Sequence, residues 1–297
     1  MAAAGPILVI GRTGQVAQAL AHVGGTGVIC LGRPDADLKV AATLGQVLDR
    51  HVPAAVINAG GFTLVDKAES EPGEARALNV DGPRALARAC SARGIPLIHL
   101  STDCVFDGEN ARPYRPDDAT GPICTYGQTK LDGELAVADE LGKHLIVRVS
   151  WIFSRFGHNF VRTMLSLART RDRVSVVSDQ VGCPTHALAL ASALLDMAHQ
   201  IAEPDFDAWG TYHLAGRGET DRASLAREIF ALSAESGGPV AAVDDVLTSA
   251  YPTPARRPLN ARLDMTRTKD VFGVTLPAWQ EGLAEAVPVL IQEIVSA

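Results

Sequence analysis

The stretch Ile7-Leu-Val-Ile-Gly-Arg-Thr-Gly-Gln-Val-Ala17 decides the fold of this 297-residue chain. Its first four residues form a short apolar run, typical of a strand that is buried on both faces. Glycines at positions 11 and 14 follow, and a helical apolar pattern begins at Gln15. Glycine lets the backbone turn tightly and approach a phosphate group, whose charge then meets free N–H groups at the helix start. The spacing GxxGxxA therefore predicts a phosphate-binding turn after the first strand, with Ala17 small enough for close helix–strand packing.

The same alternation of strands and helices continues to about residue 150. Apolar runs bounded by turn residues predict further strands at Val28–Leu31, Ala55–Ile57, Pro96–Leu100 and Leu145–Val149. Apolar residues three or four apart predict helices at Gln15–His22, Leu44–His51, Glu74–Ala92 and Tyr126–Leu141. This order predicts an α/β fold with a Rossmann-type, doubly wound parallel sheet. Because crossover connections are right-handed, the carboxyl ends of the strands share one edge, where we expect the ligand.

The second half of the chain is less regular, although its patterns are those of folded protein. Pro and Gly clusters interrupt it near residues 182–184, 216–218, 237–239 and 251–258. Helical patterns persist at Ala187–Ala198, Arg222–Leu232 and Ala278–Ile294. We therefore expect residues 1–150 to form a dinucleotide-binding core. Residues 151–297 should form mainly a smaller C-terminal α/β substrate-binding lobe, with some segments returning to the core.

Composition restricts the partners that this chain can have. The formal net charge of −7 provides no overall basic surface, so nucleic acid is a poor candidate. Five scattered cysteines, without a CxxC or a His pair at ligand spacing, favour reduced thiols in the cytoplasm and no metal site. The segment Met1–Ile10 has no basic start and too short an apolar run for a signal sequence or a membrane span. We expect a cytoplasmic protein without membrane contact, either a monomer or a homodimer.

A phenol and an ammonium group occur together on one predicted helix face. Tyr126 and Lys130 are four residues apart, so one lies above the other. An adjacent cation favours the phenolate, which should move the pKa of Tyr126 down toward neutrality. Thr102 ends the fourth predicted strand, where a hydroxyl points into the ligand crevice. The pattern predicts that Tyr126 protonates a carbonyl oxygen during hydride transfer while Thr102 hydrogen-bonds that oxygen.

The tip of the second predicted strand leaves the choice of dinucleotide open. It reads Leu31-Gly-Arg33 and carries no acidic residue that would hold a ribose 2′-hydroxyl. Arg33 can pair with a 2′-phosphate, which favours NADPH, or it can be a solvated loop charge. Asp35 or Asp37 can alternatively reach an unphosphorylated ribose, so NADH remains possible.

With these residues assembled, the chain resembles the extended short-chain dehydrogenases and, within them, the family of dTDP-4-dehydrorhamnose reductases. The similarity covers nearly the whole chain. Its cofactor-side motifs are Gly11-Arg-Thr-Gly-Gln-Val, Asn58-Ala-Gly-Gly, Thr63-Leu-Val-Asp-Lys-Ala-Glu-Ser-Glu-Pro72, Leu100-Ser-Thr-Asp-Cys-Val-Phe-Asp-Gly108 and Tyr126-Gly-Gln-Thr-Lys-Leu131. Its later motifs are Arg148-Val-Ser-Trp-Ile152, Asn159-Phe160, Asp179-Gln-Val-Gly-Cys-Pro-Thr185 and Tyr251-Pro-Thr-Pro-Ala-Arg-Arg-Pro258. Two of these, at 179–185 and 251–258, are the most specific to this family.

The resemblance implies reduction of the 4-keto group of dTDP-4-dehydro-6-deoxy-L-mannose to dTDP-L-rhamnose, with NADPH or NADH as the hydride donor. It implies that the catalytic group is Thr102, Tyr126 and Lys130, and that Lys130 also holds the nicotinamide ribose. The residues expected to bind the cofactor are Gly11, Thr13, Gly14, Gln15, Val16, Arg33, Asp37, Leu38, Gly60, Gly61, Phe62, Thr63, Tyr126 and Lys130. Those expected to contact the dTDP-linked 4-keto-6-deoxyhexose are Val65, Thr102, Asp103, Trp151, Arg256 and Arg257.

Several alternatives stay open at this point. Trp151 either packs against the hexose or is a core aromatic, and Arg256 and Arg257 either grip the diphosphate or pair with nearby carboxylates. Cys104 stands where relatives commonly have an aromatic residue, which leaves the exact sugar less certain. A nucleotide-sugar epimerase or dehydratase shares the fold and the Tyr–Lys pair. A non-catalytic regulatory subunit, like that of methionine adenosyltransferase, is the alternative from another class.

Overall fold

Six parallel strands form the central sheet of the computed structural model, which describes residues 5–295. Their order is β2–β1–β3–β4–β5–β10. The bounds are β1 (Ile7–Ile10), β2 (Val28–Leu31), β3 (Ala55–Asn58), β4 (Leu97–Thr102), β5 (His144–Val149) and β10 (Gly210–His213). The predicted α/β class with a doubly wound parallel sheet is confirmed.

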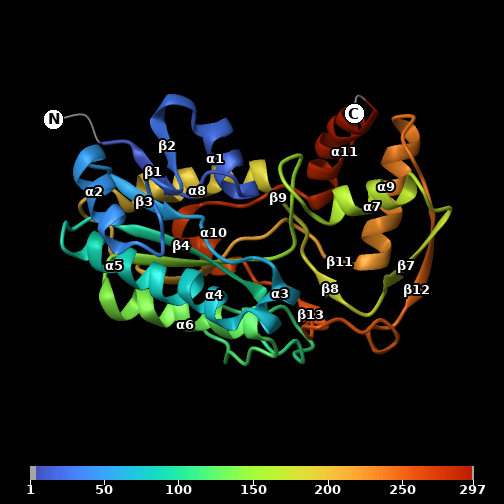
Figure 1. Cartoon of the computed structure of the whole chain (residues 1–297), viewed down its shortest axis with the longest axis horizontal. Helices are drawn as coiled ribbons and strands as arrows, with labels where there is room; N and C mark the ends of the chain where they lie inside the picture. Colours follow the sequence, from blue (N-terminus) through green and yellow to red (C-terminus); the bar gives the residue numbers. More distant parts are fainter. Residues whose placement is uncertain (1–4, 296–297) are drawn as a thin grey trace.

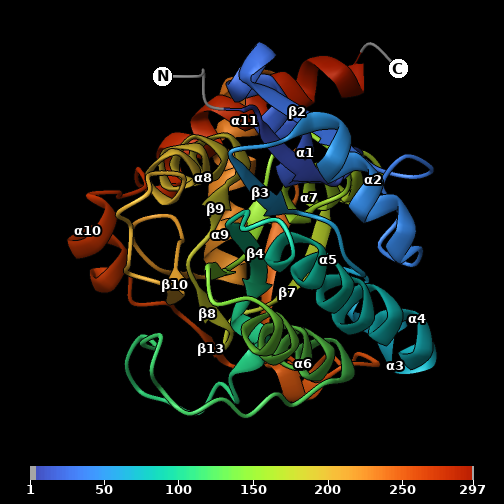
Figure 2. The same ribbon diagram turned by 90° about the vertical axis from the view of Figure 1, so that its left-hand side faces the viewer.

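Helices cover both faces of this sheet (Figures 1 and 2). Alternation along β1 sends Ile7 and Val9 into the core under α1 (Gln15–Gly24) and α8 (Ala187–Ile201). Leu8 and Ile10 face the opposite core, formed with α2 (Ala41–His51), α5 (Gly82–Ser91) and α6 (Thr125–Glu140). Both faces of the strand are buried, which explains its continuous apolar run.

Parts of the second half of the chain pack with the central sheet and its helices. Strand β10 pairs in parallel with β5, from Gly210 opposite Leu145 to His213 opposite Arg148. Helix α8 packs on α1, and α10 (Thr266–Phe272) lies beside β10. The sequence analysis assigned no strand at β10, because its residues, Gly-Thr-Tyr-His, lack an apolar run.

A second body, with its own apolar core, lies at the right of Figure 1. It contains α7 (Phe160–Ala168), α9 (Arg222–Glu235) and α11 (Trp279–Val295) around the parallel pair β7 (Arg173–Val177) and β12 (Ala242–Val246). Short strands connect it to the main sheet: β6 (Ile152–Phe153) with β9 (Thr185–His186), and β8 (Val181–Gly182) between β11 (Thr220–Asp221) and β13 (Asn260–Ala261).

The helical region before α5 differs from the single helix that was expected at Glu74–Ala92. Helices α3 (Val65–Ser70) and α4 (Pro72–Arg76) are followed by a π-helical turn at Ala77–Asp81 and then by α5. π-Helical turns are rare in proteins, and those that occur are often found at functional sites. Single-turn 3₁₀ segments also occur, at Gly25–Gly27, Asp103–Val105 and Thr248–Ala250. Within the described chain, no helix is both long and apolar enough to cross a membrane.

Candidate active site

The carboxyl end of β4 presents a hydroxyl and a carboxylate to the crevice. Thr102 is the last residue of the strand, and its Oγ1 donates to Oδ1 of Asp103 at 2.7 Å. The Cys104 N–H donates to the same Thr102 Oγ1 at 3.2 Å, and Ser150 Oγ donates to Oδ2 of Asp103 at 2.8 Å. Thr102 and Asp103 are both buried. Burial raises the pKa of Asp103, although its hydrogen bonds oppose this rise.

Helix α6 carries Tyr126 and Lys130, and two glycines fix its position. Cys124 Sγ accepts from the Gly127 N–H at 3.4 Å and so caps the helix start. A Cβ on Gly127 would come within 2.1 Å of the Cys104 carbonyl oxygen, and one on Gly133 within 2.0 Å of the Asn79 carbonyl oxygen. Larger residues would therefore push the helix away from β4 and from the π-helical turn.

The pKa of Tyr126 is shifted opposite to the expectation from sequence. Burial raises the pKa of the phenol above its ordinary value, and nearby Cys104 and Asp103 add to the rise. The Thr102 hydroxyl opposes this rise in the pKa. The predicted lowering of this pKa by Lys130 was wrong, because the ammonium group is directed elsewhere. A phenol that keeps its proton at neutral pH is the form that a proton donor needs.

Lys130 is buried, and its Nζ donates to the Leu100 carbonyl oxygen at 2.6 Å. Burial lowers the pKa of Lys130 to about 8, while Glu134 opposes this shift. Glu134 itself forms a buried ion pair with Arg148, at 2.7 Å between carboxylate and guanidinium, and accepts from Ser101 Oγ at 2.5 Å. Lys130 can therefore change its charge close to physiological pH.

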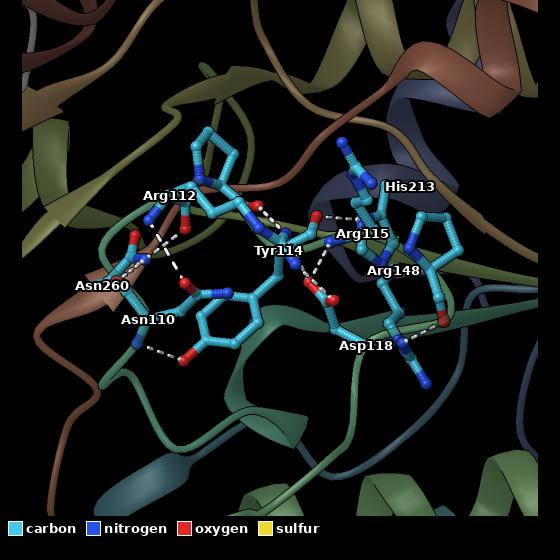
Figure 3. A network of polar contacts seen from close by, with 10 residues as sticks. Asn110, Arg112, Tyr114, Arg115, Asp118, Arg148, His213 and Asn260 are labelled. Atoms are coloured by element: carbon cyan, nitrogen blue, oxygen red, sulfur yellow. Dashed lines mark hydrogen bonds and ion pairs between the residues drawn. The ribbon is translucent and has the colours of Figure 1, made fainter.

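A polar network holds the segment between β4 and α6 in place (Figure 3). Arg148 donates to the Pro116 carbonyl oxygen at 3.2 Å, and His213 Nδ1 lies 3.0 Å from the Tyr114 carbonyl oxygen. Asn260 Nδ2 donates to two carbonyl oxygens of the same segment, at 2.7 and 2.9 Å. The sequence analysis quoted Arg148 only within a family motif and missed His213 and Asn260, because isolated polar residues on separate elements carry no spacing signal.

The first turn of α1 has the features of a phosphate cradle. Gly14 precedes the helix with no side-chain cap, and the first turn holds no acidic residue. A Cβ on Gly14 would meet nothing within 4 Å, so there is room for a ligand above the turn. Gly11 has φ +134°, a conformation that favours glycine. These residues fit a dinucleotide pyrophosphate.

Other residues expected at the cofactor have mixed surroundings. Thr13 and Arg33 are exposed, whereas the side chains of Val16 and Leu38 are buried in the cores on opposite faces of the sheet. Only the backbone of Val16 can therefore reach a ligand. Gln15 Oε1 accepts from Ser154 and Asn159 of the second half, at 2.9 and 3.1 Å.

The end of β2 brings two arginines together, one of which the sequence analysis missed. Arg12 donates to the Arg33 carbonyl oxygen at 3.2 Å. Asp37 Oδ1 accepts the Lys39 N–H at 2.9 Å and so closes a local turn. The end of β2 is therefore surrounded by Arg12 and Arg33 and by Asp37, whose carboxylate already accepts a hydrogen bond within its own turn.

The loop after β3 is connected to α6 by a residue that the sequence analysis missed. Asn79, fully buried in the π-helical turn, accepts from the Phe62 N–H at 2.8 Å and donates to its carbonyl oxygen at 3.1 Å. The same amide donates to Thr129 Oγ1 on α6 at 3.0 Å. Gly60 and Gly61 lie in the same loop, next to the exposed Thr63. The signal in the sequence that could have identified Asn79 is its polar side chain within an apolar helical pattern.

The residues expected to contact the substrate differ in whether they already pair with another residue of the chain. Val65 begins α3 next to the loop that carries Thr63. Arg257 forms an ion pair with Asp66 at 3.0 Å, the structural pairing left open above, whereas Arg256 is exposed. Among residues 5–295, no group of three or more His, Cys, Asp or Glu side chains is arranged to hold a metal ion.

Trp151 lies at the entry to the second body with a left-handed backbone, φ +44°. Arg222 lies over its ring, with the guanidinium carbon 3.5 Å from the ring centroid. A Cβ on Gly182 would come within 2.5 Å of an indole atom, so the Gly182 backbone closes on the ring as well. A ligand that reaches this indole therefore also meets Arg222, which the sequence analysis did not select.

Comparison with known proteins agrees with the resemblance seen in the sequence. The dTDP-4-dehydrorhamnose reductase of Sinorhizobium fredii (strain NBRC 101917 / NGR234) is 43% identical over 290 residues, which cover 97% of this chain and 98% of that protein. The corresponding reductase of Escherichia coli (strain K12) is 39% identical over 285 residues, or 93% of this chain and 95% of that one.

A solved structure extends the agreement to three dimensions. The crystal structure of dTDP-4-dehydrorhamnose reductase from Bacillus anthracis str. Ames in complex with NADP has a TM-score of 0.88 at 28% identity, covering 95% of this chain and 98% of that one. Residues 5–291 match the protein family described as RmlD substrate binding domain. The chain therefore belongs to the RmlD substrate binding domain family.

Proposed function

We propose that this chain is an NAD(P)H-dependent dTDP-4-dehydrorhamnose reductase. Its reaction is the reduction of the 4-keto group of dTDP-4-dehydro-6-deoxy-L-mannose to dTDP-L-rhamnose. The observation that carries the proposal is the packing of α6, which carries Tyr126 and Lys130 one turn apart, against the end of β4, which carries Thr102. The names of relatives that match over nearly their full length support the substrate class.

Each residue of this group has a distinct role in the proposed mechanism. The nicotinamide supplies hydride to C4 when it is bound. Thr102 hydrogen-bonds the C4 oxygen and fixes its direction, and Tyr126 gives that oxygen its proton. Lys130 would hold the nicotinamide ribose when the cofactor is bound. Thr102 Oγ1 now donates its only proton to Asp103 at 2.7 Å, so the hydroxyl turns from this carboxylate to the C4 oxygen when substrate binds.

The cofactor proposed is NADPH, with NADH as the alternative. Arg12 and Arg33 lie together at the end of β2, where guanidinium groups can pair with a 2′-phosphate. Asp37 accepts from its own turn and is a poorer ribose partner than a free carboxylate. The NADP complex of the Bacillus anthracis reductase is consistent with this choice. Measured kcat/KM should be higher with NADPH, and Arg33→Gln should reduce that preference.

The reaction class is tested by cofactor stoichiometry. Incubation of the purified chain with the 4-keto sugar and NADPH should consume one NADPH per sugar, followed by absorbance, and NMR should identify dTDP-L-rhamnose. Conversion of the sugar without net NADPH consumption would instead identify an epimerase or dehydratase. A stoichiometric partner protein without any turnover would identify a regulatory subunit. We propose further that the chain acts in the cytoplasm, since all five of its thiols are free, and that it is a monomer or homodimer.

A further inference from the structure

Arg222, the first residue of α9, is held beside the active site by aromatic rings. Its guanidinium carbon lies 3.5 Å from the Trp151 ring centroid and 5.1 Å from that of Phe160. The left-handed backbone of Trp151 is a strained conformation for an aromatic residue, and such strain is concentrated at functional sites. The ring stack fixes the plane of the guanidinium before any ligand arrives.

This guanidinium makes no hydrogen bond or ion pair with any residue from 5 to 295. The negative charge of Asp103 acts on the pKa of Arg222 and raises it. The Asp103 carboxylate does not pair with Arg222, however; it accepts hydrogen bonds from Thr102 and Ser150. A guanidinium has five N–H donors, and those of the half-buried Arg222 are left open to a ligand. The first turn of a helix disfavours a positive charge, so a bound anion is favourable at this position.

The positive charge of Arg257 also acts on Arg222. The charge of Arg257 and burial together lower the pKa of Arg222 to about 10, with burial the larger cause. Arg257 has a partner in Asp66, so the unused donors belong to Arg222. Two guanidinium groups near one another repel, and a doubly charged anion between them removes the repulsion. The hydroxyl groups of a neutral hexose carry no charge and cannot remove this repulsion.

We propose that Arg222 binds the diphosphate of the nucleotide-sugar substrate and thereby sets the position of the keto sugar against Thr102 and Tyr126. This inference rests on the proposed function. The planar fork of a guanidinium matches a phosphate with two parallel hydrogen bonds, which an ammonium group does not reproduce. Arg222 is thus a substrate-binding residue contributed by the second body.

The test compares dTDP with thymidine, which lacks the diphosphate. Binding of both to the full chain is measured by calorimetry for the wild type, Arg222→Gln, Arg222→Lys and the control Arg227→Gln. Arg227 is on the same helix and pairs with Asp245 at 2.5 Å on the exposed side. Arg222→Gln should weaken dTDP about 10- to 100-fold and leave thymidine within about twofold, since charged hydrogen bonds have this strength. Arg222→Lys should fall between, and Arg227→Gln should match the wild type.

Melting temperature separates ligand binding from a structural role. Without ligand, Arg222→Gln should melt close to the wild-type temperature, because it breaks no hydrogen bond or ion pair, and dTDP should raise its melting temperature less than that of the wild type. Unchanged dTDP affinity, or equal losses for dTDP and thymidine, would overturn the role of Arg222. A wild-type chain that neither binds dTDP nor oxidises NADPH with the keto sugar would instead refute the proposed function itself.

Discussion

At the scale of single residues, the proposed site contains two groups whose ordinary pKa values are changed by burial. Tyr126 keeps its proton more firmly than a free phenol, and Lys130 keeps its proton less firmly than a free amine. Sequence alone identified both residues from their i, i+4 spacing. It gave the wrong direction for the pKa of Tyr126 and none for that of Lys130, because both shifts come mainly from burial by the elements that pack around α6.

The pKa of Lys130 predicts how stability depends on pH. The unfolded chain binds a proton at this group up to about pH 10.5, but the folded chain only up to about pH 8. Burial of Lys130 therefore destabilises the fold fully below pH 8, and this penalty is lost as pH rises from 8 to 10.5. The free energy of unfolding of the wild type, relative to Lys130→Met, should rise over that window by at most roughly 3 kcal/mol. Urea unfolding at several pH values measures it, and a flat difference would contradict it.

At the scale of elements, α6 is positioned by close backbone contacts that need glycine. Gly133 lies against the carbonyl of Asn79 in the π-helical turn, and Gly127 lies against Cys104 after β4. The sequence predicted the helix but not these contacts, since the π-helical turn has no spacing pattern of its own. Asn79 likewise connects the loop at Phe62 to Thr129, three segments that are far apart in the chain.

Gly133→Ala should displace α6. The added methyl group would lie 2.0 Å from a backbone oxygen, which cannot rotate away. We expect a loss of about 1–3 kcal/mol in the free energy of unfolding and a lower kcat, because Tyr126 and Lys130 move with the helix. Gly73→Ala is the matched control: a Cβ there meets nothing within 4 Å, so stability should be unchanged or slightly higher. Equal stabilities for the two variants, from urea unfolding, would rule out the contact as a constraint.

At the scale of the whole molecule, the chain returns twice from the second body to the main sheet. In the first return, helix α8 covers one face of the sheet and β10 extends its edge; in the second, α10 packs beside β10. The sequence predicted the first five strands, because each is an apolar run, and it missed β10, which is short and polar. It also missed Arg222, because a single cation at a helix start is recognisable only once Trp151 is placed against it.

This arrangement predicts that residues 1–150 do not fold alone. Without α8, the side chains of Val9, Leu20 and Leu145 lose the helix that covers them. We expect the fragment to aggregate or to lack a cooperative thermal transition, whereas the full chain shows one. Circular dichroism and size-exclusion chromatography of the two proteins make the comparison. A monomeric fragment with a sharp melting transition would contradict the prediction.

The most direct test of the whole account is the turnover of Tyr126→Phe. The variant should fold, bind NADPH as the wild type does, and lose about 10²- to 10⁴-fold in kcat for reduction of the 4-keto sugar, because only the proton donor is removed. The control Tyr212→Phe, which removes a hydroxyl that donates to the Ala208 carbonyl away from the site, should keep its turnover. NADPH oxidation at wild-type rate by a folded Tyr126→Phe protein would show that the proton comes from another group.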